Sequence, residues 1–344
     1  MYQSIFPAGK IVDATASNAD AVHELATSWR LDQRQLEPGR YSARFQGVHT
    51  ARLQLALSYR SHSTWVGGRV PAGSTVFFVL LPSRAPRFFG HQPFLPGQVG
   101  VMTGDEEFTL QLIGASQVLS IAVNARLADH QARQILGASF DQLGRDGLIN
   151  LRPGPAGATL GVRLHAWLRE AVTPAVPLAE KPVAREFENL ILKNLLGELD
   201  PIPPVQSHPD RRRLAMAADE YLRQRPDQPL GLPQLCATIG GSPRTVQIGY
   251  RETFGLSLKA ALQALRFNGA RRDLHASRGQ KVFVKEVALK WGFMHLGRFS
   301  VGYRRWFGEG PGMALGKEAP STKHLRTLHL NQRRNAFSPV RAVA

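Results

Sequence analysis

Cysteine is almost absent from this sequence of 344 residues, since Cys236 is the only one. One thiol can form neither an intramolecular disulfide nor a thiolate zinc site, which excludes a disulfide-stapled secreted fold and a zinc finger. The N-terminus has no basic start followed by a long apolar run, so no signal peptide is expected. The longest apolar run, Val76–Leu81, is far shorter than the roughly 20 residues that span a bilayer. We therefore expect a cytoplasmic protein with no membrane partner.

Acidic residues are also scarce, because 26 Asp and Glu stand against 43 Lys and Arg, for a net charge of +17. This excess is unevenly placed. Residues 211–344 hold 24 basic and 8 acidic side chains, whereas residues 1–210 hold 19 and 18. A strongly cationic region indicates an anionic partner such as nucleic acid. The last two fifths of the chain are the region that should bind it.

Short apolar segments separated by glycine and proline follow one another between residues 41 and 123. Their spacing predicts a series of short strands, hence a sandwich or a barrel. Apolar residues then recur at helical spacing in residues 160–172 and 185–199. These two helices either form a dimer interface or pack against the strands.

Four prolines fall within ten residues around 201–210, which favours an extended interdomain linker. The basic segment 317–344 lacks sustained periodicity, and we expect a disordered tail that is either solvated or used for contact. The predicted organisation is an N-terminal β-rich domain at 1–200, the linker at 201–210, a basic domain at 211–316 and the tail.

An internal repeat occupies the basic region. A short amphipathic helix followed by a glycine turn occurs twice, 52 residues apart, with the apolar positions Leu232, Leu235, Cys236 and Ile239 and then Val284, Val287, Ala288 and Trp291. A second helix follows each turn, with the apolar positions Val246, Tyr250 and Phe254 in the first copy and Phe299, Tyr303, Trp306 and Phe307 in the second. Two helices joined by a tight glycine turn are typical of a helix-turn-helix motif, which is therefore predicted twice.

Local chemistry supports the second helix of each copy. Ser242 is a good N-cap and Pro243 fits the first helical position, whereas the second copy has the weaker capper His295. Between the copies, the sequence predicts one helix over Ser257–Ala276, with a length of about 30 Å. Adjacent major-groove turns lie about 34 Å apart, so this helix could hold two recognition helices in neighbouring grooves. Gly269 within it indicates close packing or a kink.

The segment Gly292–Pro311, with the two segments that precede it in the repeat, resembles the DNA-binding domain of the AraC/XylS transcriptional regulators. The resemblance covers roughly residues 211–316. The N-terminal half is similar in style to the effector-binding and dimerisation half of that family, a β-rich cupin-like barrel followed by helices. The resemblance implies an α+β two-domain fold and a non-enzymatic transcription activator. It also implies promoter DNA and an unidentified small-molecule effector as partners, with RNA polymerase and a second copy of the chain as further candidates.

The resemblance places the second helix of each motif in the major groove. Arginine pairs with guanine and glutamine with adenine there, while apolar side chains contact thymine methyl groups. We therefore expect Arg244, Gln247 and Arg298 to read bases, and Ile248, Leu296 and Val301 to meet methyl groups. Arg251, Arg304 and Arg305 are expected to hold phosphates. Thr245 and Gly297 complete the candidate DNA-binding residues, and Gly249 and Gly302 are expected at outward or flanking positions.

Two alternatives belong to other classes. The first is an enzyme or small-molecule carrier built on the β-rich half. His49, His62 and His91 lie in that half but form no closely spaced ligand set, so neither a metal nor a cofactor is expected. The second is a non-specific nucleic-acid-binding protein, which explains the charge but not the repeat. Cys236 is expected to be a small buried helix contact.

Overall fold

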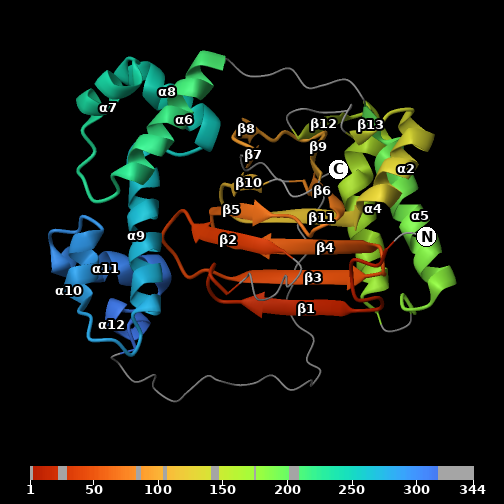
Figure 1. Ribbon diagram of the computed structural model, residues 1–344, viewed down its shortest axis with the longest axis horizontal. Coiled ribbons are helices and arrows are strands. Elements are labelled where there is room, and N and C mark those ends of the chain that lie inside the picture. The colour runs from red at the N-terminus through yellow and green to blue at the C-terminus, as the bar shows by residue number, and fades with distance from the viewer. Residues whose placement is uncertain are drawn as a thin grey trace.

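Two antiparallel sheets form the N-terminal half of the chain (Figure 1). The computed structural model describes residues 3–21, 29–82, 87–103, 107–140, 147–173, 176–200 and 209–316. The expected linker lies almost entirely, and the expected tail entirely, outside these residues. Within them, the larger sheet has the order β1 (Ile11–Ala16), β3 (Ala43–His49), β4 (Leu53–Arg60), β11 (Ser116–Asn124), β6 (Ser74–Leu80), β9 (Gln98–Thr103), β12 (Leu148–Leu151) and β13 (Leu199–Asp200).

The smaller sheet faces the larger one and has the order β2 (Arg30–Gln35), β5 (Thr64–Arg69), β10 (Glu107–Leu112), β7 (Arg87–Phe89) and β8 (Gln92–Pro93). An apolar core lies between them, with Phe78 from the larger sheet against Phe108 from the smaller one at a ring separation of 5.1 Å. Among the described residues the strands form two open sheets and no closed barrel. The predicted β-rich half is therefore confirmed as a pair of facing sheets.

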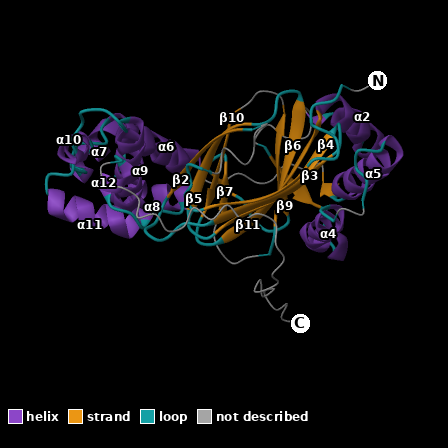
Figure 2. Ribbon diagram, turned by 90° about the horizontal axis from the view of Figure 1, so that it is seen from below, coloured by secondary structure: helices purple, strands orange, loops and turns teal. Residues whose placement is uncertain are grey.

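Three helices cover the outer face of the larger sheet (Figure 2): α2 (Ala125–Leu136), α4 (Pro155–Ala171) and α5 (Lys181–Gly197). Because side chains alternate along a strand, β4 directs Leu55 and Leu57 into the core that also buries Leu164 of α4 and Ile191 of α5. The helices expected at residues 160–172 and 185–199 correspond to α4 and α5. Their apolar stripes pack against the sheet.

All regular secondary structure in the described part of the C-terminal region is helical. It contains α6 (Pro209–Gln224), α7 (Leu232–Ile239), α8 (Pro243–Phe254), α9 (Leu258–Ala276), α10 (Val284–Lys290), α11 (Leu296–Phe307) and α12 (Pro311–Ala314). Figure 1 shows α9 running between a group formed by α6, α7 and α8 and a group formed by α10, α11 and α12. The two groups have separate apolar cores, and α9 contributes Leu258 and Leu262 to one and Phe267 and Leu274 to the other.

The single connecting helix predicted between the repeats is thus confirmed as α9. Gly269 lies where α9 meets α10, and a Cβ atom added there would stand 2.2 Å from the Trp291 ring. The Trp291 indole also donates to Asp273 of α9 at 2.8 Å. Of the two readings of Gly269, close helix packing is the observed one.

The helical region is docked on the smaller sheet through hydrogen bonds between main chain and side chains. Asn268 of α9 donates to the Gln35 carbonyl oxygen at 2.7 Å, and the Gln35 amide donates to the Trp306 carbonyl oxygen at 3.0 Å. Gln111 of β10 donates to the Phe254 carbonyl oxygen. A buried cation adds to this contact, because Arg271 of α9 pairs with Asp20 at 2.7 Å and also with Glu309.

Candidate nucleic-acid interface

Helix α8 begins at a well-formed cap. Gly240 takes the left-handed conformation that ends α7, and the Ser242 hydroxyl accepts a hydrogen bond from the Thr245 backbone N–H at 3.2 Å. Val246 and Tyr250 are buried on the inner face, as predicted. The opposite face exposes four of the expected contact residues: Arg244, Gln247, Ile248 and Arg251. Thr245 is half-buried, and its hydroxyl lies 2.8 Å from that of Ser242.

Helix α11 repeats this arrangement with a weaker start, because the His295 side chain forms no capping hydrogen bond. Phe299, Tyr303 and Trp306 form its buried stripe. The remaining face exposes all six expected residues: Leu296, Gly297, Arg298, Val301, Arg304 and Arg305. Val301 is 71% exposed, so this face offers apolar as well as cationic groups.

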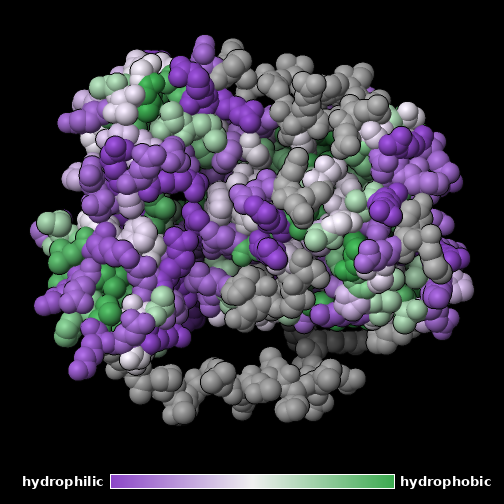
Figure 3. All heavy atoms as spheres, in the orientation of Figure 1, coloured by the Kyte–Doolittle hydropathy of each residue, from purple (hydrophilic) through white to green (hydrophobic). Residues whose placement is uncertain are grey.

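The exposed surface before α11 contains one residue that sequence reasoning did not single out. Met294 is 75% exposed and directly precedes the capping residue of α11. Figure 3 shows hydrophobic atoms at the surface where Figure 1 places α10 and α11. The signal for Met294 was its place in the turn between the two helices, where a side chain is not needed for the core.

The connecting helix α9 sets the distance between the exposed faces of α8 and α11. Helix α9 has 19 residues and is therefore about 28 Å long. Figure 2 places α8 and α11 on the same side of the helical region. This length approaches the spacing of about 34 Å between successive major-groove turns on one face of DNA.

The cations on these faces differ from the other arginines of the helical region. Arg223 pairs with Asp219 at 2.6 Å and Arg211 with Glu252 at 3.0 Å. By contrast, within the described part of the chain no acidic side chain pairs with any of the exposed arginines of α8 and α11: Arg244, Arg251, Arg298, Arg304 and Arg305. Their charge is therefore available to an external anion.

Two glycines lie elsewhere than expected. A Cβ atom added to Gly249 would stand 2.6 Å from the Arg211 carbonyl oxygen of α6, and one added to Gly302 would stand 2.7 Å from the Phe267 ring of α9. The outward or flanking placement is wrong for both, because each lies where a neighbouring helix comes close. Neither position belongs to the exposed faces.

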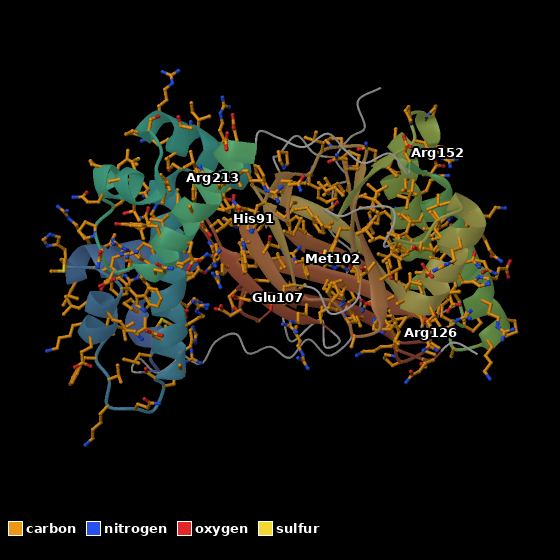
Figure 4. All side chains as sticks on the ribbon, turned by 45° about the horizontal axis from the view of Figure 1, so that its top comes forward. His91, Met102, Glu107, Arg126, Arg152 and Arg213 are labelled. Atoms are coloured by element: carbon orange, nitrogen blue, oxygen red, sulfur yellow. The ribbon has the colours of Figure 1, made fainter. Side chains whose placement is uncertain are left out.

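The histidines and the cysteine considered for a metal site or a reactive thiol take part in packing. His49 is buried beside Gln54, and His91 packs on the Phe254 ring at the contact between the smaller sheet and α8 (Figure 4). Cys236 is buried, and this burial raises the pKa of its thiol. No group of three or more His, Cys, Asp or Glu residues that could hold a metal occurs among the described residues. Among those residues, too, every helix is too short or too polar to cross a bilayer.

Two helix-turn-helix units sharing one central helix define a double helix-turn-helix DNA-binding domain. Residues 235–315 match the model of a helix-turn-helix domain family. A probable thc operon regulatory protein from Rhodococcus erythropolis is 34% identical over 108 residues, which are 31% of this chain and 32% of that protein. The XylDLEGF operon transcriptional activator from Pseudomonas putida is 27% identical over 143 residues, which are 42% of this chain and 43% of that protein.

Among solved structures, a probable AraC family transcriptional regulator from Rhodopseudomonas palustris is 28% identical and covers 30% of this chain and 95% of its own, with a TM-score of 0.28. The matches to the two operon regulators from Rhodococcus erythropolis and Pseudomonas putida each span less than half of the relative's length. The C-terminal region is an AraC/XylS-type DNA-binding domain, which confirms the resemblance seen in its sequence.

Proposed function

We propose that this chain is a transcription regulator that binds promoter DNA through α8 and α11 and activates transcription in response to a small molecule. The observation that carries the proposal is the pair of exposed, unpaired cationic helix faces on one side of α9. The relatives named as operon regulators support the same function.

In this proposal each helix lies in a major groove. Arg244, Gln247 and Arg298 read base edges, because their donors and acceptors match those of guanine and adenine. Arg251, Arg304 and Arg305 neutralise phosphates and make binding salt-dependent. The apolar side chains of Ile248, Leu296 and Val301 meet thymine methyl groups, and Thr245 and Gly297 line the same surface.

The two-sheet region, residues 1–200, would act as the sensing domain in the manner of a cupin-like barrel, and residues 211–316 as the output domain. The protein would work in the cytoplasm and catalyse no reaction. RNA polymerase would be its partner at the promoter, and a second copy of the chain would pair with it. Facing sheets with an apolar interior suit a sensor, because they can enclose a small ligand.

The experiment is a gel-shift titration on duplexes selected from a random-sequence library by the full chain. Arg298→Ala should relax discrimination between selected and random duplexes by roughly tenfold or more, because one base contact contributes about 1–3 kcal/mol. Arg304→Ala should weaken both duplexes about equally and reduce the salt slope by about 1. Arg126→Ala, on α2 at the far end of the molecule (Figure 4), removes the same charge as a control.

Two results would count against the proposal. If both variants bind as Arg126→Ala does, α11 does not enter the groove. Equal affinity of the unaltered chain for selected DNA, random DNA and RNA at physiological salt would indicate a non-specific nucleic-acid-binding protein instead.

A further inference from the structure

A cavity lies between the two sheets of the N-terminal half. It is lined by both sheets and by the segment before β2. Most of its wall is apolar, and four aromatic side chains dominate it: Trp29, Phe45, Phe78 and Phe108. Apolar cavities with a few placed polar groups are the usual form of a small-molecule site.

One charged group faces this cavity. Arg60 of β4 lines it and is 5% exposed. Its Nε donates to the Gln33 side-chain oxygen at 2.9 Å and its Nη1 to the Ser58 hydroxyl at 3.1 Å, and it also bonds the Tyr41 hydroxyl. All of these partners are neutral. No carboxylate pairs with Arg60 among the described residues.

A buried cation with neutral partners is costly, because its hydration is lost and no opposite charge replaces it. The lowered pKa of the Arg60 guanidinium has this cause, since burial opposes its charged form. An arginine kept in such a place stabilises the fold less than an apolar residue of similar volume would. Its positive charge is therefore not neutralised by a described acidic side chain.

A second buried polar group lines the same cavity. Gln33 of β2 lines the cavity and is 4% exposed, and its Nε2 has no hydrogen-bond partner. Its side-chain oxygen is already used by Arg60, so the unused atom is a donor. The cavity therefore presents a cation and a free N–H donor, and the two oxygens of one anionic group can accept from both.

We propose that this cavity is the effector site and that it takes a small apolar carboxylate, whose ring or chain contacts Trp29, Phe78 and Phe108 while its oxygens bind Arg60 and Gln33. The planar carboxylate matches the guanidinium fork. A sugar would need more polar partners than this aromatic wall offers. The ligand class rests on the proposed function, in which the two-sheet region senses a small molecule.

The site is close to the contact that holds the helical region. Gln33 and Gln35 lie two residues apart on β2, so their side chains share one face of the strand. Gln35 is bonded to Trp306 and, through its carbonyl oxygen, to Asn268. A ligand that forms a hydrogen bond with the Gln33 amide would therefore contact β2, the strand that is also bonded to α9 and α11.

The test is calorimetric titration of the full chain with phenylacetate, cyclohexanecarboxylate and hexanoate, and with phenylacetamide as the neutral match to the first. At least one acid should bind, and phenylacetamide should bind at least tenfold more weakly than phenylacetate if that acid is bound. Arg60→Met should weaken the bound acid at least tenfold. Ser120→Leu, which fills the cavity from β11, should block the same acid while leaving Arg60 in place.

Binding of none of the three acids at millimolar concentration would overturn the ligand class, as would equal binding of acid and amide. Acid binding unaffected in a folded Ser120→Leu chain would overturn the location, even if Arg60→Met fails to fold. Gel shifts on the same preparations separate this proposal from the proposed function. If the unaltered chain binds an acid but no DNA, the proposed regulator function is rejected. If it binds DNA but none of the acids, only the ligand class is rejected.

Discussion

At the residue scale, His49 shows how burial fixes a protonation state. The Gln54 amide oxygen accepts from the Trp29 indole at 2.8 Å, so its nitrogen must donate to His49 Nε2, also at 2.8 Å. An accepting Nε2 belongs to a neutral imidazole with its proton on Nδ1. Burial and the nearby Lys10 lower the pKa of His49 to about 4.

This pKa predicts an acid-sensitive fold. The histidine of the unfolded chain takes up a proton near pH 6.5, whereas His49 in the folded chain takes it up only near pH 4. Its contribution is therefore complete above pH 6.5 and is lost as the pH falls toward 4, by up to about 3 kcal/mol. Urea unfolding at a series of pH values should show this decline, and His49→Leu should flatten it.

The same change at the exposed His295 controls for removing a histidine. An equally steep decline in His49→Leu and in the unaltered chain would mean that other groups cause the acid sensitivity. His91, His165 and His275 also have pKa values lowered chiefly by burial, so part of the decline should remain in any single variant.

At the scale of elements, helix packing in the DNA-binding domain depends on glycines whose position at helix contacts the sequence did not predict. Gly249 has ordinary helical neighbours in the chain, and only the position of α6 shows that a side chain would collide there. Gly297 lies in α11, yet among the described residues no atom of a neighbouring element lies within 4 Å of a Cβ atom added to it. The two positions form a matched pair.

We predict opposite effects for alanine at these two glycines. Gly249→Ala should destabilise the fold by roughly 1–3 kcal/mol, because the clash is with backbone that cannot rotate away. Gly297→Ala should stabilise it by up to about 1 kcal/mol through helix propensity alone. Thermal unfolding measures both, and a stabilising Gly249→Ala would show that α6 and α8 are not in close contact in solution.

Strands and helices with clear periodicity could be predicted from the sequence, and those with buried polar positions could not. The strands β4, β6, β9, β10 and β11 and the helices α4, α5 and α9 follow apolar patterns and were expected. Strand β2, with the sequence RLDQRQ, was missed because its buried positions are Gln33 and Gln35. The Gln33 side-chain oxygen accepts from Arg60, and the Gln35 amide donates to Trp306 as well as to the nearby carbonyl groups of Glu37 and Gly39. No local pattern reveals the distant partners.

The candidate DNA-binding surface could be predicted because its helices have clear apolar periodicity. The repeat marks which positions of α8 and α11 are apolar, so the exposed positions follow by helical geometry. The buried pairing of Arg60 with neutral groups was not predictable, because it depends on strands brought together by the fold.

At the scale of the whole molecule, buried hydrogen bonds contribute to the contact between the sheets and the helical region. We predict that Asn268→Ala, which removes the hydrogen bond to Gln35, will speed amide hydrogen exchange in β2 and α9. The expected cause is the loss of a buried contact worth about 1 kcal/mol. Exchange measured by mass spectrometry reads both segments at once.

Gln224→Ala is the control, because Gln224 is an exposed residue of α6 whose side chain bonds Glu220 on the same helix. Its exchange pattern should match that of the unaltered chain in β2. If Asn268→Ala also leaves β2 unchanged, the docking of the helical region does not depend on the hydrogen bond between Asn268 and Gln35.

The two exposed helices have a consequence for the DNA they would occupy. Helices α8 and α11 carry different side chains and are joined in one order by α9, so one chain has no twofold axis of its own. A sequence read by both is therefore not a palindrome and has a direction along the duplex. Inverting such a sequence would turn the attached sheets to face the opposite end of the promoter.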